Sequence, residues 1–172
     1  ALEKAVSTFG GLDSVVANVG SGTSRAGWEL ETRDWESALE SNLLGGMALS
    51  SASLPRLIAR GSGTLTFVSS IAGCEAISAP VAYSASKAAV QSAMKNLSRM
   101  VGPQGVRVNA VSPGNVLFPG GTWERKLGER RAFFENYIHQ EVPLQRFGQP
   151  GEIADMVVFL ASERASFVTG AC

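Results

Sequence analysis

The sequence has no excess of either charge, only two cysteines, a single histidine and no long run of apolar residues. Lys and Arg together number 15, as do Asp and Glu, which argues against nucleic acid or an anionic membrane as a partner. Cys74 and Cys172 have no metal or disulfide spacing, and the single His139 argues against a histidine metal site. No apolar run could span a bilayer, and residues 1–4 do not resemble a signal peptide. We therefore expect a metal-free protein in the reducing cytoplasm.

The composition favours a single folded domain. Of the 172 residues, 45% are hydrophobic and 17% are charged, which suits a globular protein with a sizeable core. No repeat, low-complexity tract or linker divides the chain. We expect one domain over residues 1–172.

Strand-like and helix-like segments alternate along the chain. Buried strands are predicted at residues 13–18, 64–69 and 106–111, with the beginning of another at 167–169. Helices are predicted to end near residue 9, to cover residues 34–60, 80–101 and 122–140, and to start again at residue 150. Asp34 is the expected cap of the second helix. The alternation predicts an α/β fold with a doubly wound parallel sheet and helices on both faces.

Polar residues follow each predicted strand. Asn18 ends the first strand, Ser69 and Ser70 end the second, and Ser-Pro-Gly at residues 112–114 breaks the third. In parallel sheets of this kind, ligands bind beyond the carboxyl ends of the strands. These residues therefore mark a candidate binding site.

Tyr83 and Lys87 lie four residues apart on one predicted helix, so their side chains share a face. A free phenol is a poor base near neutral pH, but a neighbouring ammonium stabilises the phenolate form. The pair can therefore give and take a proton. Ser70 can present its hydroxyl to a substrate oxygen. Asn42 falls in the middle of a helix, where it is either a polar relay or a solvated side chain.

Six motifs in order resemble the short-chain dehydrogenase/reductase family. The most specific is Tyr-x-x-x-Lys at residues 83–87, preceded by the serine at position 70. The other matching segments are residues 17–20, 41–45, 69–73, 107–114 and 147–154. The resemblance covers essentially the whole chain and implies a Rossmann-like fold.

The family resemblance implies a role for each polar residue. Tyr83 would be the general acid/base, and Lys87 would hold the cofactor ribose and assist Tyr83. Ser70 would hold the substrate oxygen, and Asn42 would anchor a water in a proton relay. The hydride would pass between NAD or NADP and a ketone or secondary alcohol. The residues expected along the cofactor are Asn18, Gly20, Tyr83, Lys87, Pro113, Gly114 and Val116. Relatives of this kind also lead us to expect a homodimer or homotetramer.

The chain departs from the family pattern in one large respect. The family begins with a strand and a Gly-rich turn that receives the pyrophosphate, and no such turn occurs here. Matching the motifs in order, we expect strands 4 to 6 of the family and the start of strand 7. The strand at residues 13–18 would then have an open edge, and the 172 residues alone would bind dinucleotide poorly. An alternative is a non-catalytic binding or scaffold domain that has kept the fold.

The segment after residue 114 resembles the family's mobile lid over the substrate. Its aromatic residues indicate either an apolar substrate of medium size or simple core packing: Phe118, Trp123, Phe133, Phe134 and Tyr137. A charged run is expected to form a solvated helix face, with binding of an anionic substrate as the other interpretation: Arg125, Lys126, Glu129, Arg130 and Arg131.

Overall fold

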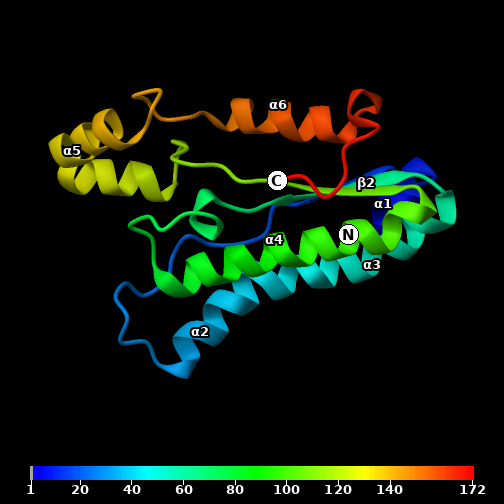
Figure 1. The fold of residues 1–172 in the computed structure, drawn as a ribbon, viewed down its shortest axis with the longest axis horizontal. Helices are drawn as coiled ribbons and strands as arrows, with labels where there is room; N and C mark the ends of the chain where they lie inside the picture. The colour runs from blue at the N-terminus through cyan, green and yellow to red at the C-terminus, as the bar shows by residue number, and fades with distance from the viewer. Residues whose placement is uncertain (1) are drawn as a thin grey trace.

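The structure is a computed structural model that describes residues 2–172 (Figure 1). The strands are β1 (Ser14–Ala17), β2 (Gly63–Val68) and β3 (Val106–Val111). The helices are α1 (Leu2–Phe9), α2 (Thr32–Leu39), α3 (Gly45–Arg60), α4 (Val81–Val101), α5 (Thr122–Glu141) and α6 (Pro150–Ala161). A π-helical turn, η1 (Glu40–Leu44), joins α2 to α3, and the 3-10 turns are η2 (Ile71–Gly73), η3 (Gly102–Gln104) and η4 (Glu163–Ala165). Within residues 2–172, no helix combines the length and apolarity needed to cross a bilayer.

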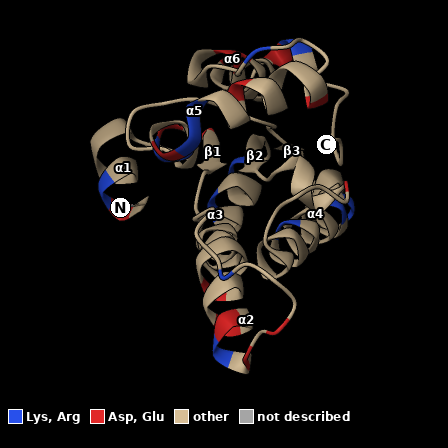
Figure 2. Ribbon diagram, turned by 90° about the vertical axis from the view of Figure 1, so that its left-hand side faces the viewer, with Lys and Arg blue, Asp and Glu red and all other residues tan. Residues whose placement is uncertain are grey.

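The sheet is parallel and has the strand order β1-β2-β3. Helices α3 and α4 pack against one of its faces and α6 against the other, an arrangement that Figure 2 shows nearly end-on. The register places Leu65 opposite both Val15 and Val108. In the part of the chain that the structure describes, the outer edge of β1 has no partner strand. The expected α/β sheet with helices on both faces is confirmed.

The main core lies between the sheet and the layer formed by α3 and α4. Leu65 and Phe67 of β2 are buried together with Val108 of β3. Leu57 of α3 and Met94 of α4 close this core from the helix side. Burial on both faces is typical of strands in parallel sheets. This burial fixes the position of the carboxyl end of β2, where the next loop begins.

Arg107 attaches α6 to the opposite face of the sheet. Its guanidinium donates to the carbonyl oxygens of Leu160 at 2.7 Å and Ser162 at 3.1 Å. A cation at the carboxyl end of a helix complements both the unpaired carbonyls and the helix dipole. The attachment leaves the amino end of α6, at Pro150, beside the carboxyl ends of the strands.

The helix expected over residues 34–60 is interrupted. It begins at Thr32 after the cap Glu31, so the expectation that Asp34 is the cap is wrong. Asp34 is the third helical residue, and its carboxylate accepts a hydrogen bond from the Glu31 backbone N–H at 3.0 Å. The two side chains form a reciprocal capping box. The π-helical turn η1 then separates α2 from α3, and such turns are frequent at functional sites.

Two other expected elements differ in detail. The charged helix α5 contains non-helical backbone at Arg130, with φ −148° and ψ 60°, so it consists of two helical pieces. Residues 167–169 are not assigned as a strand. The chain still runs along β3, because Gly170 donates to the Val108 carbonyl at 2.8 Å. The Thr169 hydroxyl accepts from the Val108 N–H, where a strand would offer a backbone carbonyl.

Glu152, the third residue of α6, holds the start of that helix. Its carboxylate accepts from the Gln149 backbone N–H at 2.8 Å and from Arg146 at 2.8 and 2.5 Å. The hydrogen bond from Arg146 and that from the Gln149 backbone lower the pKa of Glu152 from 4.5 to about 2. A carboxyl whose pKa is lower in the folded state stabilises the fold above its unfolded pKa. That contribution is lost as the pH falls from about 4.5 through about 2.

We predict that Glu152→Gln lowers the unfolding temperature at pH 7 because it removes the charge but keeps an acceptor for the cap. The difference from the parent protein should shrink between pH 4.5 and pH 2, as the parent carboxyl becomes protonated. Thermal unfolding followed by circular dichroism across this range checks it. Asp155→Asn, an exposed change one turn later, is the control and should have little effect. A constant difference at every pH would contradict the assignment.

Candidate active site

The polar residues at the strand ends meet in one cavity of about 640 Å³. Of the residues predicted to be catalytic or to lie along the cofactor, those that line it are Asn18, Ser70, Tyr83, Pro113, Gly114 and Val116. They come from the ends of all three strands and from α4. A smaller adjoining cavity of about 170 Å³ is lined by the predicted residues Asn18, Gly20, Asn42, Tyr83 and Lys87. Tyr83 and Asn18 therefore lie where the two cavities adjoin.

Ser70 is held by the turn that follows β2. Its hydroxyl oxygen accepts a hydrogen bond from the Ala72 backbone N–H at 3.1 Å and so caps η2. The same turn packs closely on α4 at Gly73. A Cβ at Gly73 would lie 2.7 Å from the Lys87 carbonyl carbon and 2.8 Å from the Ala88 nitrogen. Only glycine permits this approach, which brings Ser70 to the helix that carries Tyr83 and Lys87.

Lys87 is buried, with 5% of its surface exposed, although it is a charged residue. Its ammonium donates to the Val68 carbonyl oxygen at 3.1 Å and lies 5.9 Å from the centroid of the Tyr83 ring. Burial lowers the pKa of the Lys87 ammonium. Within residues 2–172, no carboxylate lies within 4 Å of this ammonium. A buried ammonium that makes one protein hydrogen bond is suited to bind a polar ligand.

Asn42 is the buried residue of η1, with 2% of its surface exposed, so the interpretation as a solvated side chain is wrong. Its amide nitrogen donates to the carbonyls of Ala38 at 3.1 Å and Ser21 at 3.2 Å. Its amide oxygen accepts from the Ser21 backbone N–H at 3.1 Å. Asn42 therefore holds the loop after β1 against the helix.

Gly20 lets that loop come close to Asn42 and Lys87. Its φ of +143° is rarely adopted by other residues. A Cβ at this position would lie 2.4 Å from Asn42 Oδ1 and 3.3 Å from Lys87 Nζ. Gly20, which was expected to lie along the cofactor, is thus a position where the backbone itself forms the wall of the smaller cavity.

Gln91 is a site residue that the sequence reasoning missed. Its Nε2 lies 3.1 to 3.2 Å from three acceptors, which are Ser69 Oγ, the Ser70 carbonyl oxygen and Ser112 Oγ. It thus ties α4 to the loops after β2 and β3. The signal was available, because Gln91 follows Lys87 by four residues and Tyr83 by eight on the same helix face.

The aromatic residues of α5 form a cluster beside the site. Trp123 lies 5.7 Å from both Phe134 and Tyr137 and 5.4 Å from Phe147, measured between ring centroids. Trp123, Phe134 and Tyr137 also line a third cavity, of about 270 Å³, together with Ser70. The aromatics both pack with one another and line a cavity.

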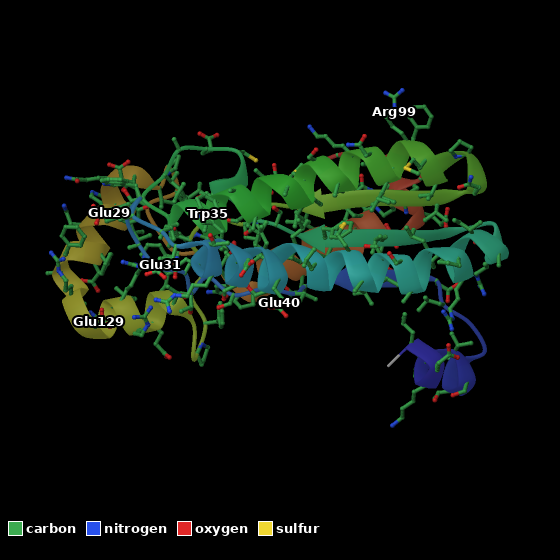
Figure 3. All side chains as sticks on the ribbon, turned by 90° about the horizontal axis from the view of Figure 1, so that it is seen from below. Glu29, Glu31, Trp35, Glu40, Arg99 and Glu129 are labelled. Atoms are coloured by element: carbon green, nitrogen blue, oxygen red, sulfur yellow. The ribbon has the colours of Figure 1, made fainter. Side chains whose placement is uncertain are left out.

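The charged run on α5 is only partly a solvated face. Arg125 and Glu129 are exposed and paired at 3.5 Å, and Figure 3 shows Glu129 on this helix. Lys126 instead lies over the aromatic cluster, with its ammonium 4.3 Å from the Trp123 ring centroid and 5.5 Å from that of Phe134. The expectation of a solvated face is therefore wrong for Lys126. Arg125 and Lys126 are adjacent in the sequence and both basic, so the sequence cannot show that one lies over the aromatic rings and the other pairs in solvent.

We predict that Gly20→Ala destabilises the fold by about 1 to 3 kcal/mol, because it combines backbone strain with a clash against Asn42. Gly128→Ala is the matched control, since a Cβ there meets nothing within 4 Å and should change stability by less than about 1 kcal/mol. Urea unfolding of both variants measures the difference. Equal effects would show that the close approach of the loop is unimportant.

We predict that Gln91→Ala costs about 1 to 3 kcal/mol of stability, because Ser69 and Ser112 lose a hydrogen-bond partner. Amide hydrogen exchange at residues 70–73 should also become faster, since the turn loses its tie to α4. Asn96→Ala, an exposed change on the same helix, should cost less than about 0.5 kcal/mol and leave that exchange unaltered. Unchanged exchange in Gln91→Ala would refute the positioning role.

Comparison with known proteins identifies the family. The whole chain, residues 1–172, matches the family described as enoyl-(acyl carrier protein) reductase. The chain is similar to isoepoxydon dehydrogenase of Penicillium expansum, with 38% identity over 170 residues that cover 98% of this chain and 64% of the relative. It therefore spans somewhat less than two thirds of the length of that relative.

Solved structures agree with this match. One is an oxidoreductase of the short chain dehydrogenase/reductase family from Burkholderia thailandensis, with 34% identity and a TM-score of 0.89 over 99% of this chain and 65% of that one. Another is a 7 alpha-hydroxysteroid dehydrogenase in complex with NADH and 7-oxo glycochenodeoxycholic acid, with 28% identity and a TM-score of 0.87 over 98% and 64%. The chain belongs to the short-chain dehydrogenase/reductase family of oxidoreductases.

Proposed function

We propose that this chain carries the catalytic part of an NAD(P)(H)-dependent enzyme that interconverts a ketone and a secondary alcohol. The observation that carries the proposal is that Ser70 and Tyr83 line one cavity at the strand ends, while the buried ammonium of Lys87 lies beside the Tyr83 ring. The structural relative solved with NADH and a 7-oxo ligand supports the same chemistry.

The residues around Lys87 suit the nicotinamide and ribose half of such a cofactor. The Lys87 ammonium uses one donor on the Val68 carbonyl, which leaves donors for ribose hydroxyls. Gly20 and Asn18 line the same small cavity, and Gly114 and Val116 line the larger one. When bound, the cofactor supplies or accepts the hydride. The proposal assigns no residue of this chain to the pyrophosphate.

Ser70 and Tyr83 act on the substrate oxygen. The Ser70 oxygen already accepts from Ala72, so the serine hydrogen is left to donate to the substrate. Tyr83 donates its phenolic proton to the same oxygen as the carbonyl carbon is reduced, and takes it back in the reverse direction. The positive charge of Lys87 beside the ring stabilises the phenolate that remains.

Asn42 is proposed to anchor a water that returns the proton to Tyr83. The Ser21 N–H uses one acceptor position of its amide oxygen, and the second lone pair suits a water. The same amide holds the loop that lines the cofactor cavity. In this proposal, the proton relay and the attachment of the loop after β1 both depend on the side chain of Asn42.

We predict that Tyr83→Phe, made in the protein expressed from its complete gene, lowers kcat at least about 100-fold because the proton donor is lost. Its unfolding temperature and dinucleotide binding should match the parent. Ser92→Ala, on the exposed side of the same helix, should keep the parental rate. The assay is nicotinamide absorbance with a panel of ketones and secondary alcohols and both cofactors. Equal turnover by parent and Tyr83→Phe would show that Tyr83 is not the proton donor, and absence of turnover in the parent would favour the non-catalytic alternative.

A further inference from the structure

The cavity of about 270 Å³ joins the proposed reaction site to helix α5. Ser70 lines it from the turn after β2 and Tyr83 lines it from α4. The aromatic residues of α5 line its other side: Trp123, Phe134 and Tyr137. Its volume lies just below the range of about 300 to 1,000 Å³ that is typical of small-molecule sites. A molecule whose oxygen lies at Ser70 and Tyr83 would therefore extend its other end toward these aromatic rings.

Lys126 is the one residue with a formal charge among those that line this cavity. In the described part of the chain, no carboxylate lies within 4 Å of its ammonium. Its neighbours on the helix differ, because Arg125 pairs with Glu129 at 3.5 Å and Arg131 with Glu135 at 2.8 Å. The cavity thus offers a positive charge that has no counter-ion from residues 2–172.

The contact of Lys126 with Trp123 does not by itself account for this arrangement. An ammonium over one ring face leaves its remaining N–H donors for other partners, while the carbon stem covers apolar surface. Burial, and secondarily the charge of Arg125, lower the pKa of the Lys126 ammonium, so a bound anion would relieve an unfavourable environment. The aromatic lining would also strengthen such an ion pair by excluding water.

We propose that this pocket selects a substrate with a carboxylate on a compact apolar body, and that Lys126 binds the carboxylate. The inference rests on the proposed function for the place of the reacting oxygen. It adds the second recognition point, at the end of the substrate away from Ser70 and Tyr83. In this arrangement one end of the molecule reacts and the other is held by charge.

Direct binding tests this inference without requiring turnover. The probes are cyclohexanecarboxylate and its neutral isostere cyclohexanecarboxamide, titrated by calorimetry into the protein expressed from its complete gene, with and without NAD or NADP. We expect the carboxylate to bind at least about tenfold more tightly than the amide. Lys126→Gln should abolish this preference, because it should weaken binding of the carboxylate and leave binding of the amide unchanged. Lys126→Arg should keep the preference.

Arg125→Gln is the matched control, because it removes the same charge from the same helix at a side chain that points away from the cavity. It should leave the preference within about twofold of the parent, since exposed charges are well screened. Equal binding of the two probes, no binding of either, or an equal loss in Arg125→Gln would overturn the inference. Loss of turnover in Tyr83→Phe with the carboxylate preference intact would support both proposals. Full turnover in Tyr83→Phe with that preference intact would reject the proposed function alone.

Discussion

The site depends on the close packing of α4 against the turn that follows β2. At Gly73 the turn lies so near the helix backbone that a Cβ would not fit. Gln91 fastens the same contact from the helix side through Ser69 and the Ser70 carbonyl. Because Tyr83 and Lys87 precede Gln91 on one face of this helix, the packing that stabilises the fold also sets the place of Ser70 relative to Tyr83. The same contact therefore supports both the fold and the candidate site.

The candidate site is also supported by the irregular helical turn between α2 and α3. The π-helical turn η1 presents Asn42 to the loop after β1, and the amide binds both the N–H and the carbonyl of Ser21. Gly20 then lies against Asn42 and Lys87 without an intervening side chain. An irregular turn that costs some helix regularity thus fixes a loop whose backbone forms part of the cavity wall.

Much of the fold and most of the candidate site followed from local patterns. The three strands and the Tyr83–Lys87 face were predictable because strand and helix periodicities are local properties of the chain. Gln91 followed the same spacing but was missed, because its role lies in hydrogen bonds to two loops that only the fold brings together. The burial of Asn42 was not predictable, since only the contact with Ser21, 21 residues away, separates a buried amide from a solvated one.

By itself, the sequence determined the α/β alternation, the residues at the strand ends and the family that the motifs resemble. Only the tertiary structure decided that Lys126 faces the aromatic cavity while Arg125 faces solvent. It also decided that Glu31 is the N-cap of α2, with Asp34 as the third helical residue of the capping box. Adjacent charged residues on a helix look alike in sequence. Their environment depends on which side of the helix meets the rest of the molecule, and that is set by packing between segments far apart in the chain.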